Sequence, residues 1–329
     1  MTLLSALKVV GRTLEQSSGQ RFVMRGVIVY AMPFYETNRE PDPALASVTE
    51  AAYVNRWAMF ARIRALGFNT VKIPVSSAVY SGDAYGLDGT SVYLARLRAI
   101  VNAANIEGLY VVLCWSDAIG EGYWVITEYS SAFSMMKAVE FTFAGNPGVI
   151  YEPLDEPHEI SWSQWIAISE RMLQYWRATI GYRGVIIADT EGWSWNFDPS
   201  YVNALISYDE ALLGTPNLLI ANHRYPNGNS CFCGAERATW DSVIGQYIGS
   251  FPLIGSEYGI EDVVGPPELA WGQDFVTYLK NNAIPSGFNG ALMFVWNWIN
   301  PNTMTDPATG KLTAWGTAIF DALSASPSN

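Results

Sequence analysis

Charged residues are scarce in this 329-residue sequence. Asp, Glu, Lys and Arg make up only 15% of the chain, with 19 basic residues against 31 acidic ones and a net charge of −12. Proteins that bind nucleic acid or anionic membranes carry clusters of basic residues, and the sequence has no such cluster. We therefore expect neither nucleic acid nor a membrane surface among its partners.

Histidine and cysteine are also rare. The two histidines are His158 and His223, and the three cysteines are Cys114, Cys231 and Cys233. Without a CxxC pair or an HExxH motif, the sequence predicts no structural or catalytic zinc site. The Cys231 and Cys233 pair is compatible with a tight disulfide or with two free thiols. The odd total indicates that no disulfide framework supports the fold.

Long apolar runs are missing, because no stretch approaches the roughly 20 residues that span a bilayer. Residues 1–10 contain neither the charged start nor the apolar centre of a signal peptide. Low charge combined with an acidic balance is nevertheless typical of extracellular proteins. We expect an extracellular, monomeric protein whose signal peptide has been removed.

Apolar and aromatic residues are abundant. Half of the residues are hydrophobic and 14% are aromatic, including 13 Trp and 18 Tyr. This composition supports a large core. It also suits a surface that binds sugars, since the CH-rich faces of pyranose rings stack on aromatic rings.

Short apolar runs alternate with helical patterns along the whole chain. Continuous apolar runs indicate strands buried on both faces, as in parallel sheets. Eight such units predict an α/β fold of the (β/α)8 barrel type, with residues 1–329 as one catalytic domain. A doubly wound sheet is the alternative, but the first run lacks the Gly-rich phosphate loop that usually follows it. The runs are residues 21–31, 70–75, 110–115, 149–154, 184–188, 218–222, 252–256 and 291–296.

Helices are predicted between these runs. Apolar residues recur on one helical face between residues 93 and 104, and residues 162–180 and 269–281 show the same pattern. Gly67 and Gly108 stand where two of the helices should end. Residues 1–20 predict a hairpin with a Ser/Gly turn at residues 17–20, which would cap the bottom of the barrel.

Polar residues end several of the predicted strands, and a barrel of this kind builds its active site there. The fourth run ends in Asp155 and Glu156, the sixth in His223 and the seventh in Glu257. Two carboxylates facing each other across the barrel mouth are what glycoside cleavage requires. One protonates the leaving oxygen and the other attacks the anomeric carbon.

Four segments resemble motifs of glycoside hydrolase family 5. Residues 148–158 resemble the strand-four signature, which usually ends in Asn-Glu-Pro-His, and residues 251–259 are similar to the strand-seven nucleophile motif. Residues 223–226 match the His-x-Tyr of strand six, and residues 293–302 resemble the strand-eight segment of cellulase-like members. The order and spacing are those of the family, and the resemblance covers nearly the whole chain.

The resemblance implies a role for each matching residue, and it implies that no metal or organic cofactor is needed. Glu156 corresponds to the general acid/base and Glu257 to the nucleophile. Tyr225 would donate a hydrogen bond to Glu257, His223 would lie near the acid/base, and Trp296 would form the floor of the −1 subsite.

The sequence departs from the family pattern at three places. Lys72 stands where an Arg is usual, Ser116 stands where the family has a sugar-binding His, and Asp155 replaces the Asn that binds the sugar 2-hydroxyl. Lys72 and Asp155 are candidate substrate contacts, although Lys72 could instead be a buried ion-pair partner. A protonated Asp155 would mimic Asn, which predicts a preference for acidic pH. Trp115 is either a sugar platform or a packing residue of its loop.

These features predict a retaining endo-β-1,4-glucanase that binds a β-linked polysaccharide or oligosaccharide. A β-mannanase or glucomannanase using the same machinery is an alternative, because the 2-hydroxyl that separates glucose from mannose would fall near Asp155. A carbohydrate-binding pseudoenzyme is a second alternative, motivated by the three altered positions.

Overall fold

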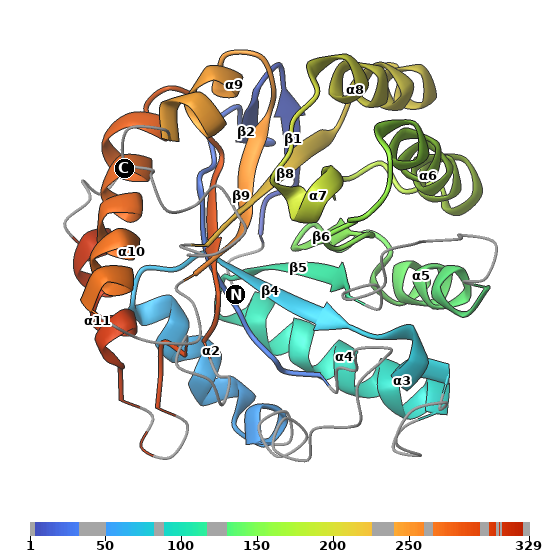
Figure 1. The fold of residues 1–329 in the computed structure, drawn as a ribbon. Helices are drawn as coiled ribbons and strands as arrows, with labels where there is room; N and C mark the ends of the chain where they lie inside the picture. The colour runs from blue at the N-terminus through green and yellow to red at the C-terminus, as the bar shows by residue number, and fades with distance from the viewer. Residues whose placement is uncertain are drawn as a thin grey trace.

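Eight parallel strands close into a barrel in the order β10-β3-β4-β5-β6-β7-β8-β9 (Figure 1). The computed structural model describes residues 4–32, 51–81, 89–116, 130–225, 240–259, 266–296, 303–306, 309 and 311–324. The predicted (β/α)8 barrel is confirmed, and the closed sheet excludes the doubly wound alternative. The barrel strands are β3 (Met24–Ile28), β4 (Thr70–Val75), β5 (Tyr110–Trp115), β6 (Val149–Glu152), β7 (Ile186–Ala188), β8 (Leu218–Arg224), β9 (Leu253–Tyr258) and β10 (Gly290–Met293).

The strands form where the sequence has its continuous apolar runs. Every residue of β4, β5 and β8 is buried, because one face of each strand points into the barrel and the other meets the surrounding helices. The β4–β5 register is unbroken from Thr70 opposite Tyr110 to Val75 opposite Trp115. The polar residues at the ends of these strands are therefore held on a rigid frame.

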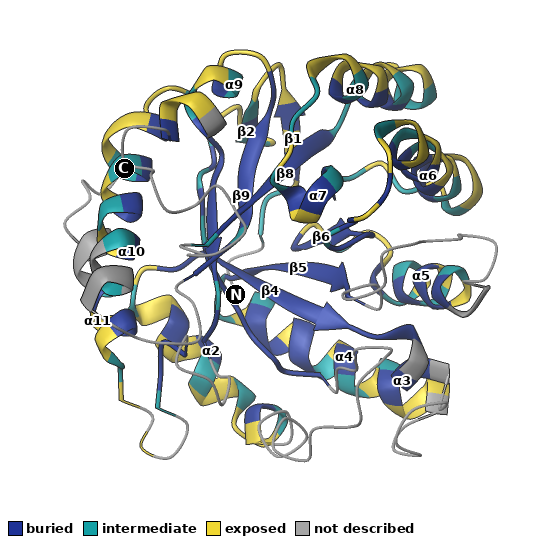
Figure 2. Cartoon of the chain, in the orientation of Figure 1, coloured by how far each residue is buried: buried dark blue, intermediate teal, exposed yellow. Residues whose placement is uncertain are grey.

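Helices surround the barrel, with their buried faces toward the strands and their exposed faces outward (Figures 1 and 2). The predicted stops at Gly67 and Gly108 are confirmed, since both glycines have a left-handed φ, of 89° and 79°, which ends a helix at low cost. The described helices with eight or more residues are α2 (Arg56–Ala65), α4 (Gly89–Ile106), α5 (Ser130–Phe143), α6 (Trp162–Gln174), α8 (Pro199–Leu213), α10 (Pro266–Tyr278) and α11 (Ala314–Ser324).

Shorter helical segments complete the described units. They are α3 (Ser77–Ser81), η2 (Tyr175–Ile180), α7 (Glu191–Ser194), η4 (Asp241–Gly245), α9 (Gln246–Ile248) and η5 (Leu279–Ala283). The helix pattern predicted at residues 162–180 corresponds to α6 followed by η2, and the pattern at 269–281 falls within α10 and η5. Helix α6 begins with a capping box in which Ser161 and Gln164 bond reciprocally.

A hairpin of β1 (Leu7–Val10) and β2 (Thr13–Gln16) packs below the barrel, as predicted. Its backbone is tied to barrel residues through Val9 N–H, which donates to Asn217 Oδ1 at 2.8 Å, and Leu14 N–H, which donates to Asn289 Oδ1 at 2.7 Å. The turn position differs from the prediction. It lies at Gly11, whose φ is 60°, because a second glycine-containing turn precedes the Ser/Gly turn.

No helix among the described residues is both long and apolar enough to cross a membrane. Cys114 is buried with a free thiol. Cys231 and Cys233, for which a disulfide and free thiols were both considered, lie outside the described residues.

Candidate active site

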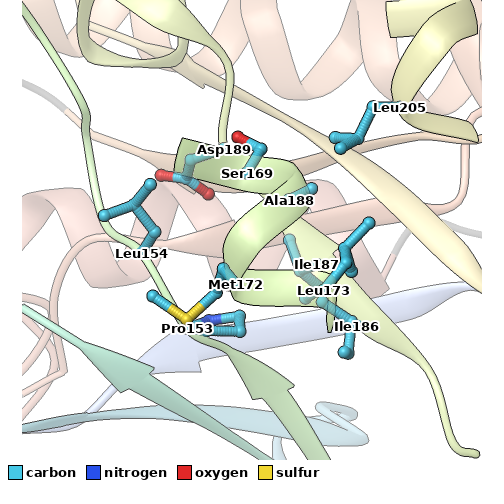
Figure 3. Close-up of a pocket in the computed structure, with 10 residues that line it drawn as sticks. All are labelled: Pro153, Leu154, Ser169, Met172, Leu173, Ile186, Ile187, Ala188, Asp189 and Leu205. Atoms are coloured by element: carbon cyan, nitrogen blue, oxygen red, sulfur yellow. The ribbon is translucent and has the colours of Figure 1, made fainter. Parts of the chain in front are cut away.

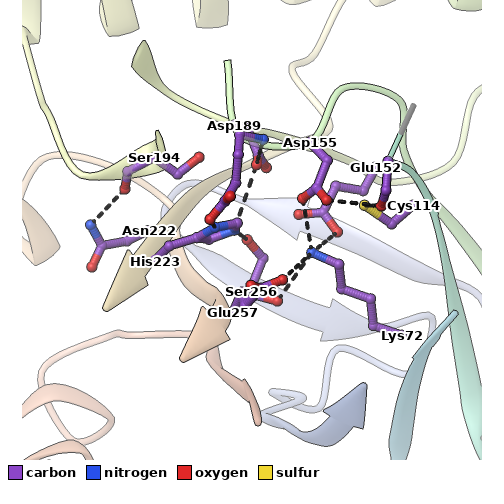
Figure 4. A network of polar contacts seen from close by, with 12 residues as sticks. Lys72, Cys114, Glu152, Asp155, Asp189, Ser194, Asn222, His223, Ser256 and Glu257 are labelled. Carbon is purple, nitrogen blue, oxygen red and sulfur yellow. Dashed lines mark hydrogen bonds and ion pairs between the residues drawn. The ribbon is translucent and has the colours of Figure 1, made fainter. Parts of the chain in front are cut away.

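Polar side chains from successive strands converge at one end of the barrel (Figure 4). Lys72 belongs to β4, His223 to β8 and Glu257 to β9. Asp155 and Glu156 follow β6 after a short turn. The structure thus brings together the carboxylates, the lysine and the histidine that the sequence singled out.

Glu156 and Glu257 are paired across this end of the barrel. A carboxylate oxygen of each, together with a ring nitrogen of His223, lies within 4.8 Å of the other two atoms. The side chains of Glu156 and Glu257 are 14% and 13% exposed, whereas the other carboxylates of the cluster are at most 2% exposed. These two are therefore the carboxylates of the cluster that a ligand can reach.

Glu257 is held by two neighbours. The Tyr225 hydroxyl donates to Oε1 at 2.5 Å, and Lys72 Nζ lies 3.6 Å from Oε2. Burial raises the pKa of Glu257 to about 7, Lys72 opposes this rise, and the nearby charge of Glu156 adds to it. The arrangement is suited to a carboxylate that must be ionised in an enclosed site.

Glu156 occupies a strained backbone conformation with a φ of 47°. Its side chain meets His223, with Oε1 2.7 Å from Nδ1. Its carbonyl accepts a hydrogen bond from His158 Nδ1 at 2.7 Å. His158 in turn stacks on Trp193, whose side chain is partly exposed, so the loop carrying Glu156 is fixed from several sides.

His223 is a neutral bridge between Glu156 and β9. Its Nε2 lies 2.8 Å from Ser256 Oγ, and the ring is completely buried. Burial lowers the pKa of His223, outweighing the opposing effect of Glu257. An uncharged imidazole beside Glu156 does not force that carboxyl to ionise.

Lys72 is buried below the paired glutamates and bridges three carboxylates. Its Nζ lies 3.0 Å from Glu152 Oε2 and 3.3 Å from Asp155 Oδ1, besides its contact with Glu257. Burial alone would lower the pKa of Lys72, but Asp155 and the other anions raise it well above its usual value. The predicted substrate contact is thus corrected to the ion-pair alternative, because the side chain is only 1% exposed.

Asp155 differs from its predicted role in the same way. Its two oxygens bind Lys72 and the Ser116 hydroxyl, which donates to Oδ2 at 2.8 Å. Burial alone would raise the pKa of Asp155, but the charge of Lys72 and the hydrogen bond from Ser116 hold it below the usual value. The carboxylate is therefore ionised, which contradicts its interpretation as a protonated mimic of Asn. The prediction of an acidic pH preference, which rested on a protonated Asp155, therefore has no support from this residue.

Trp115 is a core residue, which favours packing over the sugar platform among the two roles considered for it. Its ring is 1% exposed and packs against Tyr151 and Trp176, at centroid distances of 6.0 and 5.7 Å. Side chains alternate along β5, so Trp115 points toward the helices while its neighbours Cys114 and Ser116 face the polar cluster.

Trp296 follows β10 and is 3% exposed. Its backbone N–H donates to Ile28 at 2.8 Å, which attaches it to β3. The Arg62 guanidinium lies 5.9 Å from the centre of its ring. Its role as the floor of a sugar subsite remains a prediction.

Sequence reasoning missed Asp189, Glu152 and Ser256. Asp189 follows directly after β7 and could have been found by asking which polar residue ends the fifth apolar run. Glu152 and Ser256 lie within strands, where a polar residue among apolar ones signals a contact inside the barrel. All three join the cluster in Figure 4.

The cluster resembles a metal site in its donors. Ligand atoms of Glu152, Asp155, Asp189 and His223 lie within 4.8 Å of one another. The ammonium of Lys72 already lies against two of these carboxylates, and it supplies the positive charge that a cation would bring. We therefore interpret the group as an ion-pair network and not as a metal centre.

Comparison with known proteins identifies relatives over most of the chain. The model of the family described as cellulase (glycosyl hydrolase family 5) matches residues 36–300. The major extracellular endoglucanase of Xanthomonas campestris pv. campestris is 24% identical, over 93% of this chain and 70% of that protein. The chain spans about half the length, or less, of further curated relatives that it matches.

Solved structures show the same fold. The catalytic domain of an endoglucanase from Thermobifida fusca superposes with a TM-score of 0.72 at 16% identity, covering 97% of both chains. A β-mannanase from Streptomyces thermolilacinus, solved with mannohexaose, gives a TM-score of 0.70 at 20% identity, covering 97% of this chain and 94% of that one.

Proposed function

The chain belongs to glycosyl hydrolase family 5 and is a glycoside hydrolase, and on this basis we propose that it cleaves β-1,4-linked glucan internally, with Glu257 as nucleophile and Glu156 as acid/base. The observation that carries the proposal is the proximity of these two carboxylates, whose nearest oxygens lie within 4.8 Å. Carboxyl groups about 5 Å apart are typical of retaining enzymes, and inversion needs a wider gap for water.

The proposed reaction has two steps. Glu257 attacks the anomeric carbon while Glu156 protonates the leaving oxygen, which gives a covalent glycosyl-enzyme. Glu156 then removes a proton from water, and that water releases the sugar from Glu257. Tyr225 and Lys72 stabilise the ionised nucleophile through the contacts of 2.5 and 3.6 Å.

His223 supports the change of role of Glu156. It contacts the carboxyl at 2.7 Å and, being neutral, lets Glu156 hold its proton before the first step. A positive charge at this position would favour the ionised carboxylate and weaken the acid.

Glucan is preferred as the proposed substrate because a relative matched over 93% of this chain is described as an endoglucanase. The β-mannanase alternative has support from the fold, which the Streptomyces enzyme shares. A non-catalytic sugar-binding role has no support in the site, since both glutamates are present, paired and partly exposed. The description of the Xanthomonas relative as extracellular also supports our proposal that this protein is secreted.

Reducing-sugar release from soluble β-glucan, glucomannan and xylan, compared between wild type and Glu257→Gln, tests the assignment. We expect release from β-glucan that is lost in the variant by a factor of at least about 1,000. Preferential release from glucomannan would support the mannanase alternative. Equal activity of the two proteins would overturn the assignment of the nucleophile.

A further inference from the structure

Asp189 is a buried carboxyl for which the proposed reaction has no use. It follows the last residue of β7, and its side chain is 0% exposed. It borders a cavity of about 20 Å³ whose other lining residues, apart from Ser169, are apolar (Figure 3). A carboxyl in such surroundings is costly to keep unless it forms specific contacts.

Two contacts of Asp189 lead to Glu156. Its Oδ2 accepts a hydrogen bond from the Glu156 backbone N–H at 2.9 Å. The same oxygen lies 3.5 Å from His223 Nε2, and the opposite ring nitrogen, Nδ1, lies 2.7 Å from Glu156 Oε1. Asp189 thus contacts the backbone of Glu156 directly and its carboxyl through one intervening ring.

The backbone of Glu156 needs such support. A left-handed φ of 47° is costly for a non-glycine residue and persists only where neighbouring groups enforce it. The segment after β7 supplies a second restraint, since Trp193 N–H donates to the Pro157 carbonyl at 3.2 Å. The chain after β7 therefore holds the loop that carries Glu156.

We propose that Asp189 is a positioning residue for Glu156, acting as a neutral carboxylic acid that accepts the Glu156 N–H and shares its own proton with Glu152. The proposal rests on the acid/base role of Glu156 proposed above. It adds the residue that follows β7 to the groups that position Glu156, and it explains why a carboxyl is buried there.

The hydrogen-bond inventory supports a neutral Asp189. Its Oδ1 and both oxygens of Glu152 have no hydrogen-bond partner among the described residues, although Lys72 forms an ion pair with Glu152. Ligand atoms of Glu152, Asp155 and Asp189 lie within 4.8 Å of one another. A proton held between Asp189 and Glu152 would give one oxygen of each carboxyl a hydrogen-bond partner.

The charges around the pair agree with this assignment. The groups that face Asp189 are Lys72 from β4, Cys114 from β5, Glu152 and Asp155 from β6 and its turn, and His223 from β8. Burial, and then Glu152 and Asp155, raise the pKa of Asp189 well above its usual value, against a smaller lowering by Lys72. Two adjacent buried carboxyls with one shared cation retain a proton.

The experiment compares two substrates that differ in their need for an acid. A dinitrophenyl β-cellobioside releases its aglycone without protonation, whereas a phenyl β-cellobioside requires it. The variants are Asp189→Ala, Asp189→Asn and, as a reference, Glu156→Ala. Leu205→Ala is the matched control, because Leu205 borders the same cavity and a cavity there lowers stability without touching Glu156.

We expect Asp189→Ala to lose about 10- to 100-fold in kcat/KM on the phenyl substrate and far less on the dinitrophenyl one. Asp189→Asn should recover the rate on the phenyl substrate to within a few-fold, because a neutral amide still accepts the Glu156 N–H. Leu205→Ala should lower the melting temperature with no difference between substrates.

Equal losses of Asp189→Ala on both substrates would overturn the proposal, as would an Asn variant as impaired as the Ala variant. If Glu156→Ala itself shows no dependence on the leaving group, the acid/base assignment fails. If the rate of Glu156→Ala depends on the leaving group and that of Asp189→Ala does not, only the positioning role of Asp189 fails.

Discussion

Lys72 and Glu257 face each other across the floor of the active site, with Nζ 3.6 Å from Oε2. The lysine is fully buried, and its ammonium is shared with Glu152 and Asp155 at shorter distances. The nucleophile therefore receives only part of one positive charge. This partial compensation explains why burial still raises the pKa of Glu257 to about 7.

The pH dependence of kcat/KM should follow this pKa. Glu257 attacks as a carboxylate, so the competent fraction of free enzyme falls as the pH drops below about 7, the value that burial gives Glu257. We expect an acidic limb near neutrality, measured with an aryl cellobioside, and hence no optimum at acidic pH. A profile that stays flat down to about pH 5 would contradict the electrostatic account.

Replacing Lys72 with Met should shift the acidic limb of the kcat/KM profile to higher pH. Lys72 lowers the pKa of Glu257, so its removal should raise this pKa further and shift the acidic limb to higher pH. Lys72→Arg is the matched control, because it keeps the charge while changing the shape of the donor. An acidic limb that stays in place in Lys72→Met would show that the lysine acts only on Glu152 and Asp155.

Tyr225→Phe should reduce activity with little change in fold. The hydroxyl donates to Glu257 Oε1 at 2.5 Å, and a hydrogen bond to a charged group contributes about 1.5–3 kcal/mol. We expect kcat/KM to fall roughly tenfold to a hundredfold. Circular dichroism and the melting temperature provide the control. An unchanged rate would indicate that Lys72 alone is sufficient to hold the nucleophile.

The barrel could be predicted because its strands are continuous apolar runs, and the strand ends identified Glu156, Glu257 and His223. The state of Asp155 could not, because it is set by Lys72, 83 positions away in the sequence. A family motif gives the place of a residue, whereas the pKa of a buried carboxyl depends on every charge packed around it.

Trp115 and Asp189 show where predicting site residues from the ends of the strands fails. Trp115 ends β5, but the alternation of side chains turns its ring outward into the layer between barrel and helices. Asp189 follows the fifth apolar run directly, but it lies outside the four segments that resemble the family motifs. To place both side chains correctly, one must know which face of the strand each residue occupies as well as where the strand ends.

Trp115→Ala tests the corrected role of that residue. Removing a fully buried indole that packs on Tyr151 and Trp176 should lower the free energy of unfolding by about 3–5 kcal/mol. If the ring only packs in the core, the folded fraction should bind substrate with an unchanged KM. A raised KM in protein that remains folded would restore the interpretation as a sugar platform.

The raised pKa of Glu257 also predicts how stability depends on pH. Between its ordinary value of 4.5 and about 7, the folded state holds a proton that the unfolded state has released, so wild-type stability should fall as pH rises through this range. Glu257→Gln removes the ionisation. We expect the variant to melt a few degrees higher than wild type at about pH 8, and the difference to shrink toward pH 5.

Glu210→Gln, on the exposed face of α8, is the control for a change of net charge. Lys72 keeps Glu152 and Asp155 as partners in Glu257→Gln, so loss of the third contact should offset only part of the gain. The upper bound of the stabilisation is about 3 kcal/mol, from the difference between the two pKa values. A variant that melts below wild type at both pH values would mean that the nucleophile contributes more as a partner of Lys72 than its burial costs.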